Sequence, residues 1–236
     1  DEFPFVDVVD ASGNLYWTRG MHTGFERALR QSCDYYLWLN DDTQLVPDAL
    51  RALLAQMEAL QRREGRSLIL IGATAERSTG KITYGGRVVS TRLRPFNYRL
   101  VWSEREPVPC VAMEGNSVLI PAALAAQLGN LDPVFEHAMG DTDYGLRALR
   151  AGCKLYVAAG VAGYCSTNAL QGTYFDASLP LRRRWKLIVG RKGLPVRSWL
   201  HFSRRHGGLL WPLHFSWPYV TLGLTSLLNR PRKRPV

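Results

Sequence analysis

Two clusters of acidic residues have the types and spacing that a reaction could use. In the first, Asn40-Asp41-Asp42 directly follows the apolar residues 35–39. Adjacent carboxylates repel each other unless a cation or hydrogen-bond donors hold them. Their oxygen atoms suit Mg²⁺ or Mn²⁺, particularly when a substrate diphosphate completes the coordination shell. The sequence thus predicts a divalent metal site here, while a turn in which Asp42 or Thr43 caps the next helix is the alternative.

The second cluster is Gly140-Asp141-Thr142-Asp143, at the start of an amphipathic pattern that ends at Gly152. Unpaired backbone N–H groups and the helix dipole stabilise a carboxylate at a helix start. Asp141 is therefore predicted either to cap this helix or to act as a reactive carboxylate. Asp143 has the i, i+4 spacing from Arg147 that also favours a simple ion pair.

A third polar group, Glu114-Gly115-Asn116, lies inside an otherwise apolar stretch, residues 111–120. A glycine inside a strand pattern lets the backbone pass close to a ligand or to a neighbouring strand. The same pattern fits a β-bulge, and the residues alone do not decide between the two.

The elements that must position these clusters alternate between strand and helix. Apolar runs of strand length are separated by patterns of helical periodicity, which predicts a parallel or mixed, mostly parallel, doubly wound α/β sheet flanked by helices. Strands are expected at residues 3–9, 35–39, 68–73 and 98–102, a Gly85-Gly86 hairpin at 82–89, and helices at 20–33, 47–63 and 121–128. Ligands of open α/β sheets bind at the carboxyl ends of strands, where Asn40-Asp41-Asp42 would lie.

Composition narrows the class of protein and its partners. With 236 residues, 46% of them hydrophobic, the chain is long enough for one well-buried core and short for two. The formal net charge of +10 favours an anionic partner: nucleotide phosphates, acidic lipid or nucleic acid. The four cysteines are far apart, so neither a zinc site nor a disulfide framework is predicted, and a reducing compartment is expected. The chain opens at Asp1 with no signal peptide, which we interpret as a fragment.

Beyond Thr167 the character of the sequence changes. Residues 180–192 are strongly basic with Trp185 among them, residues 209–228 carry no formal charge, and residues 230–234 are basic again. An uncharged segment of this length just suffices to span a bilayer. Its prolines, polar residues and basic flanks instead favour a segment lying in the interface of an anionic membrane, with a buried core segment as a further alternative.

Taken in order, these motifs resemble those of the inverting, GT-A-fold nucleotide-sugar glycosyltransferases of family 2. They are most similar to the rhamnosyltransferase-like members that extend cell-surface polysaccharides. The resemblance covers about residues 5–165 and is carried by Asn40-Asp41-Asp42 after its strand and by residues 114–121 (EGNSVLIP), 131–135 (LDPVF) and 140–148 (GDTDYGLRA). Residues 13–21 also resemble a Gly/Asn-rich segment of the family.

The resemblance implies a role for each matching residue. Asp42 would be the metal ligand and Asp141 the general base that takes the acceptor proton during one in-line displacement. The leaving diphosphate would need a cation, Mg²⁺ or Mn²⁺, held in place beforehand. The implied donor-binding and substrate-binding residues are Asn40, Asp41, Glu114, Gly115, Asn116 and Asp143. The implied partners are a nucleotide-diphosphate sugar and a glycan or lipid-linked acceptor.

The chain departs from the family pattern in three places. No strand with an Asp-containing turn precedes Phe3, so about one βαβ unit of the nucleotide-binding half is expected to be missing. Gly140-Asp141 stands where the family usually has Glu-Asp. Cys165 lies where many members have a histidine, and a thiol is a poor ligand for Mg²⁺.

Together these observations predict a GT-A-like catalytic domain at 1–167 and a helical, membrane-interfacial extension at 168–236. The expected location is cytoplasmic, on the inner face of the cell membrane. The alternatives are a nucleotidyltransferase of similar fold and a non-catalytic module that docks on membranes or binds nucleic acid. Nucleic acid is the less favoured partner because no RNP-type or helix-turn-helix signature accompanies the positive charge.

Overall fold

The computed structural model describes residues 3–91 and 94–228, which form two compact units. The first unit holds residues 3–91 and 97–167, and with them every candidate site residue. The second unit holds residues 94–96 and 168–228. The basic residues 230–234 lie outside the described residues.

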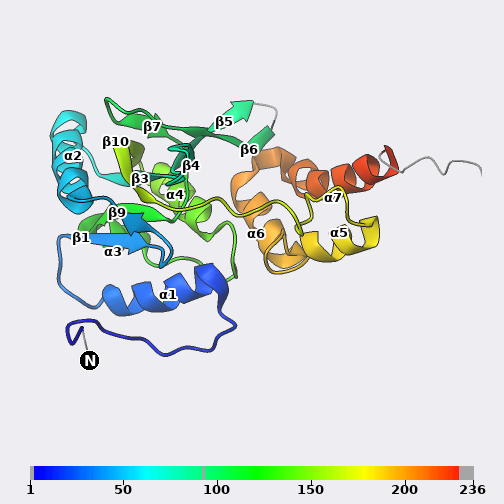
Figure 1. Ribbon diagram of the computed structural model, residues 1–236, viewed down its shortest axis with the longest axis horizontal. Coiled ribbons are helices and arrows are strands. Elements are labelled where there is room, and N and C mark those ends of the chain that lie inside the picture. Colours follow the sequence, from blue (N-terminus) through cyan, green and yellow to red (C-terminus); the bar gives the residue numbers. More distant parts are fainter. Residues whose placement is uncertain (1–2, 92–93, 229–236) are drawn as a thin grey trace, which may run out of the picture. The chain divides into compact units, whose positions relative to one another are not determined.

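A seven-stranded mixed sheet forms the centre of the first unit (Figure 1). Its path runs β1 (Tyr35–Leu39), β9 (Ser117–Pro121), β3 (Leu68–Ala75), β10 (Lys154–Tyr164) and β2 (Gln44–Leu45), with β4 (Ile82–Tyr84) beside β3 and β7 (Val108–Cys110) beside β10. β3 and β10 pair in parallel, whereas β9 pairs antiparallel with β1 and β3. β1, β3 and β10 therefore run in the same direction. The predicted mixed α/β fold is confirmed, although its parallel character lies in these three strands and their other partners are antiparallel.

Helices cover both faces of this sheet, and β3 is therefore buried at every position. Leu68 and Leu70 of β3 share one cluster with Leu53, Met57 and Leu60 of α2 (Ala49–Glu64). The alternate residues Ile69 and Ile71 belong to a cluster on the other face, with residues of α1 (Tyr16–Ala28), α3 (Ala122–Leu128) and α4 (Gly140–Arg150). This two-residue alternation, with apolar side chains on both faces, is what a strand covered on each side requires.

The predicted hairpin at Gly85-Gly86 is wrong. β4 pairs with β3 in the large sheet, whereas β5 (Gly86–Thr91) lies between β6 (Arg94–Val101) and β8 (Ala112–Met113) in a separate three-stranded sheet. Gly86 serves close packing instead, since a Cβ atom there would lie 2.3 Å from Val157 Cγ2. A glycine pair fits a turn and a close approach equally well, and here the second applies.

Two other sequence predictions are corrected near the N-terminus. Residues 3–9 form no strand; they are exposed and lack regular secondary structure (Figure 1). A run of apolar residues does not supply the backbone partner that a strand needs. The helix expected over 20–33 is α1, which starts and ends earlier. Its first turn is fixed by a distant contact, in which the Thr18 N–H donates to Glu136 O at 3.1 Å.

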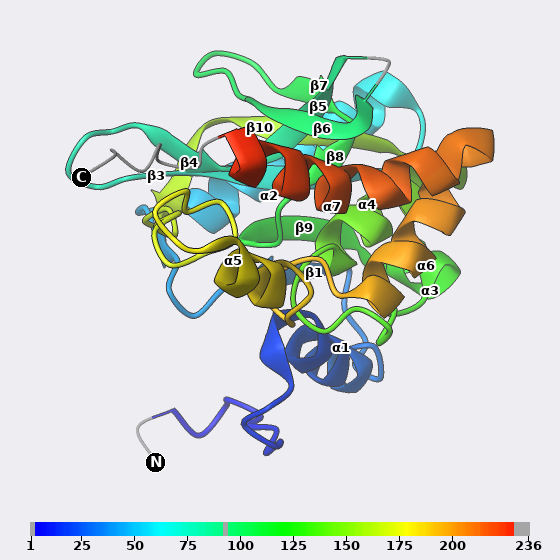
Figure 2. The same cartoon turned by 90° about the vertical axis from the view of Figure 1, so that its right-hand side faces the viewer.

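Apart from residues 94–96 of β6, the second unit is helical, as predicted for the C-terminal part of the chain (Figure 2). It contains α5 (Leu181–Ile188), α6 (Val196–His206), the short 3-10 helix η1 (Gly208–Leu210) and α7 (Trp211–Leu228). Both α5 and α6 pack against α7, and Ile188, Trp199, Phe202 and Leu222 are buried. None of the helices within the described residues combines the length and the apolar character needed to cross a bilayer.

Candidate active site

Asp141 lies in the first turn of α4, where its carboxylate joins two parts of the chain. Oδ1 accepts a hydrogen bond from the Thr142 N–H at 2.7 Å, and Oδ2 accepts one from the Gly115 N–H at 3.0 Å. The N-cap position of α4 is Met139, so Asp141 does not merely cap its own helix. Gly140 packs so closely on α1 that a Cβ atom would lie 2.2 Å from Thr18 Cγ2, which fixes where the helix begins.

The surroundings of Asp141 favour its protonated form more than water would. Burial raises the pKa of this carboxyl to about 6, and the negative charge of Glu114 adds to the rise. The N–H groups of Thr142 and Gly115 oppose it by stabilising the carboxylate. A carboxyl that titrates near neutral pH can accept a proton and remain ionised most of the time, which is what a general base requires.

Glu114 is held by the β-strands beside it. Its Oε1 accepts from Arg87 Nη2 at 2.6 Å, and its Oε2 accepts from the Gly85 N–H at 3.2 Å. Burial raises the pKa of Glu114, and the Arg87 guanidinium opposes the rise. These contacts fix the turn of residues 114–116 and place a negative charge near Asp141.

Gly115 and Asn40 meet around the indole of Trp17. A Cβ atom on Gly115 would lie 2.2 Å from Trp17 Cζ2, so only glycine fits at this position. The indole Nε1 donates to Asn40 Oδ1 at 2.6 Å, and the Asn40 N–H donates to Asn116 O at 3.1 Å. The glycine predicted to allow a close backbone approach does so, toward an aromatic side chain of α1.

Asp41 and Asp42 are exposed in the turn between β1 and β2. Besides the Asn40 N–H, a second link from this turn to Asn116 is Cys165, which directly follows β10. Asn116 Nδ2 donates to Cys165 Sγ at 3.5 Å. The pKa of the Cys165 thiol is raised by burial and then by the negative charge of Asp42, which lies close enough to act on it. The two acidic clusters of the sequence are therefore joined through Gly115, Asn116 and Cys165.

The comparison with known families identifies the class of protein. Residues 36–231 match the model for glycosyl transferase family group 2. The chain belongs to this family. No curated protein sequence matches it. The family match extends beyond residue 165, so it includes the helices of the second unit as well as the motifs of the first.

Membership makes the chain a glycosyltransferase and implies a nucleotide-sugar donor and an acceptor. It decides against the two alternatives, a nucleotidyltransferase and a non-catalytic module. The rhamnosyltransferase-like subtype and the missing N-terminal portion stay predictions.

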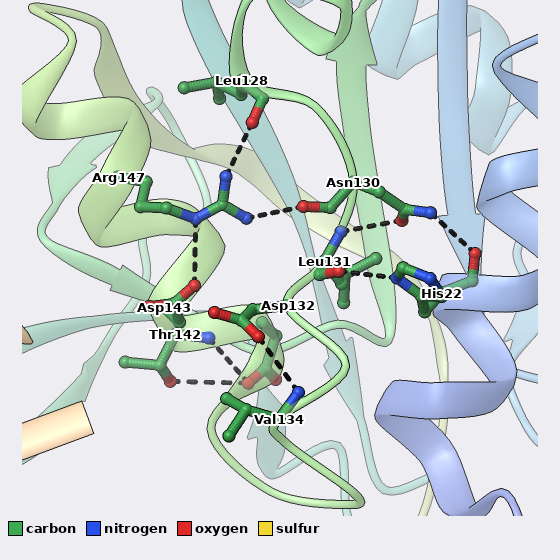
Figure 3. A network of polar contacts seen from close by, with 10 residues as sticks. His22, Leu128, Asn130, Leu131, Asp132, Val134, Thr142, Asp143 and Arg147 are labelled. Atoms are coloured by element: carbon green, nitrogen blue, oxygen red, sulfur yellow. Dashed lines mark hydrogen bonds and ion pairs between the residues drawn. The ribbon is translucent and has the colours of Figure 1, made fainter. Parts of the chain in front are cut away.

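In this glycosyltransferase Asp143 forms the ion pair that its spacing allowed. Its side chain is fully buried, and Arg147 Nε donates to Asp143 Oδ2 at 3.0 Å (Figure 3). Arg147 also donates to Leu128 O at 2.7 Å and to Asn130 O at 2.9 Å. Asn130 Nδ2 in turn donates to His22 O at 2.9 Å. The guanidinium of Arg147, held by Asp143, thus ties α4 to the end of α3 and to Asn130, which in turn contacts α1.

The acidic turn offers a metal ion few ligands from the glycosyltransferase itself. Within residues 3–91 and 94–228, no three His, Cys, Asp or Glu side chains are grouped so as to hold a metal. The exposed carboxylates of Asp41 and Asp42 can supply one or two oxygen atoms. Mg²⁺ is commonly bound by one or two carboxylates together with substrate phosphates and water. The residues present therefore fit a metal bound jointly with a diphosphate, and the metal stays a prediction.

Sequence reasoning did not single out Trp17 or Arg87 as part of the site. Trp17 lies 23 residues from Asn40, and Arg87 lies 27 residues from Glu114. The only signal for Trp17 was its place in the Gly/Asn-rich segment that resembles the family. No local pattern pointed to Arg87.

Proposed function

We propose that this glycosyltransferase moves a sugar from a nucleotide-diphosphate donor to a hydroxyl of a glycan or lipid-linked acceptor, with inversion at the anomeric carbon. The first unit is assigned the catalysis. The observation that carries the proposal is the Asp141 carboxylate, which has a pKa of about 6. Hydrogen bonds of residues 114–116 link this carboxylate to the Asn40-Asp41-Asp42 turn. Such linked acidic groups suit one in-line displacement with a base on one side and a leaving diphosphate on the other.

Asp141 takes the proton of the attacking hydroxyl in this proposal. With a pKa of about 6, roughly 90% of the enzyme holds the ionised form at pH 7. The two backbone N–H donors fix the direction in which the carboxylate points, so the acceptor must approach its free lone pairs. Asp143 acts indirectly, by holding α4 in place through Arg147 rather than by touching the donor.

Asp42, with Asp41 beside it, would hold Mg²⁺ or Mn²⁺. When bound, the ion would neutralise charge on the departing diphosphate. Asn40 is positioned by the Trp17 indole and by its own N–H bond to Asn116 O, which sets the end of β1 next to residues 114–116. A role in extending cell-surface polysaccharides follows from the resemblance of the motifs, as does a cytoplasmic location at the inner membrane face.

The test is turnover of a panel of nucleotide-diphosphate sugars by the Asp141→Asn variant. We expect a loss on the order of a hundredfold or more in kcat with little change in donor affinity, because the amide keeps the shape and cannot accept the proton. Asp48→Asn is the matched control, since it makes the same change at an exposed carboxylate. Asp48 has a left-handed backbone conformation, which asparagine also tolerates. Near-normal turnover by Asp141→Asn, or net retention of the anomeric configuration in the product, would contradict the proposal.

A further inference from the structure

The described part of α7, together with η1, presents apolar side chains on two sides. Leu222 is buried, the Trp199 indole donates to Phe215 O at 2.9 Å, and the Tyr219 hydroxyl donates to Leu194 O at 2.7 Å. These contacts hold one side of α7 against the rest of the second unit.

The other side forms what we call the α7 stripe. Its members share helical spacings of three and four residues and are each between 50 and 63% exposed: Leu210, Leu213, Trp217, Val220 and Leu224. Spacings of three and four place side chains in one row along a helix. Five large apolar side chains in one exposed row differ from the scattered exposed apolar residues of an ordinary surface, and they mark a place of interaction.

The charge of the residues around the α7 stripe indicates which kind of partner it binds. Thirteen of the thirty Lys and Arg residues follow Thr167 in the sequence, but only one of the twenty Asp and Glu residues does, namely Asp176. The formal charge is therefore about −2 up to Thr167 and about +12 after it. A partner for this segment must be anionic and must also accept apolar side chains.

The exposed neighbours of α7 have the same dual character. Trp185 of α5 is 44% exposed, and its ring lies 6.0 Å from that of Tyr219 on α7. Arg182 and Lys186 are exposed on the same helix, within one turn of Trp185. Arg204 of α6 lies over the Trp211 ring at 5.3 Å. Cations and aromatic rings thus alternate beside the uncharged helix.

We propose that the α7 stripe lies in the surface of an anionic phospholipid membrane, with the cations of α5 and α6 against the headgroups. Tryptophan and leucine enter the boundary between headgroups and acyl chains, while arginine and lysine stay at the charged layer. A second copy of this chain is the less suitable occupant, because it would bring two strongly basic segments together. A nucleic acid would satisfy the cations but leave the leucines without an apolar partner.

The experiment measures co-sedimentation of the full chain with vesicles of phosphatidylcholine alone and of phosphatidylcholine mixed with phosphatidylglycerol, without donor or acceptor. We expect binding to the mixed vesicles that weakens as salt rises. Leu213→Ser/Trp217→Ser should weaken it by tenfold or more, on the order expected for removing buried apolar side chains. Leu170→Ser, another exposed leucine of the second unit outside the stripe, should bind as the wild type does. Because no substrate is present, the result is independent of the proposed chemistry.

A charge variant and a mapping experiment complete the test. Arg182→Gln/Lys186→Gln should reduce binding to the mixed vesicles, whereas Arg51→Gln/Arg62→Gln, exposed in the first unit, should not. Amide hydrogen exchange of the wild type should show vesicle-induced protection in residues 209–228. Three results would overturn the proposal: equal affinity of the stripe variant for vesicles, protection confined to the first unit, or a wild-type dimer that the stripe variant dissociates without any vesicle binding. Oligonucleotide binding that competes with vesicles and ignores the stripe would equally overturn it.

Discussion

The two units of this glycosyltransferase differ in the exposure of their charged side chains. In the first unit Asp143 is buried and paired with Arg147, and Glu114 is partly buried and paired with Arg87, whereas Asp41 and Asp42 are exposed. In the second unit most cations are exposed, and so are the apolar side chains of the α7 stripe. A buried charge is held in one geometry by its partners, whereas an exposed charge adapts to whatever approaches. This contrast suits the two proposals, in which the first unit positions the reacting groups and the second contacts a membrane surface.

The buried ion pair of the first unit gives the largest expected effect. Asp143→Ala leaves the Arg147 guanidinium without its carboxylate, which should lower the free energy of unfolding by about 3–5 kcal/mol. Urea denaturation followed by circular dichroism measures it. Glu26→Ala removes an exposed i, i+4 pair with Arg30 and should cost less than about 0.5 kcal/mol. Similar values for the two variants would erase the contrast between buried and exposed charges.

The acidic turn after β1 is exposed and is proposed to hold the metal, so it tests whether exposure alone separates the units. Asp42→Ala should lower metal-dependent sugar transfer on the order of a hundredfold and leave stability unchanged. Initial rates over a titration of Mg²⁺ and Mn²⁺ measure the effect. Asp34→Ala, an exposed carboxylate just before β1, is the control and should transfer sugar normally. Full activity of Asp42→Ala at all metal concentrations would remove this residue from the site.

Close packing at the turn of residues 114–116 should also be measurable. Gly115→Ala places a methyl group against the Trp17 indole, and we expect a loss of about 1–3 kcal/mol in stability together with reduced turnover. Gly24→Ala in α1 has nothing within 4 Å of the new Cβ atom and should stabilise the helix by up to about 1 kcal/mol. Thermal unfolding of both variants checks the pair of signs. If both variants were more stable than the wild type, the Trp17 indole would move aside at no cost, which would contradict the prediction for Gly115→Ala.

The smallest expected effect concerns pH. The proposed mechanism needs Asp141 ionised, so kcat/KM should rise with pH through about 6, the pKa of its carboxyl. Glu114→Gln removes a nearby negative charge, which makes ionisation easier and should move this limb to lower pH by less than about one unit. Glu106→Gln, an exposed carboxylate in the same unit, should leave the limb in place. If the pH dependence of kcat/KM is the same in Glu114→Gln as in the wild type, the charge of Glu114 does not affect the proposed base.

The sequence predicted those features that depend on neighbours along the chain. The apolar residues of β3 indicated a strand covered on both faces, and Asn40-Asp41-Asp42 was recognisable because it directly follows the apolar β1. The i, i+4 spacing of Asp143 and Arg147 likewise indicated their pair. Such patterns act within one element, so their spacing alone carries the information.

Features that depend on packing between distant elements were not predictable. The hydrogen bond from Trp17 to Asn40 and the one from Gly115 to Asp141 join segments that approach only when the sheet and its helices are complete. The apolar run at residues 3–9 likewise suggested a strand, but a strand also needs a neighbouring strand, and in the described residues this segment forms none. Resemblance to the family indicated the candidate site residues. It did not predict that Arg87 opposes the rise in the pKa of Glu114.

The short turn of residues 114–116 touches both halves of the proposed chemistry. Its glycine N–H donates to Asp141, the proposed base, while its asparagine contacts Asn40 at the end of β1 and the Cys165 thiol. A donor that shifted this turn by a fraction of an ångström would therefore retune the proton acceptor at the same moment. Binding of the donor would therefore change the proposed base without any domain closure. Substitutions in this turn that alter donor preference would also change the pH optimum.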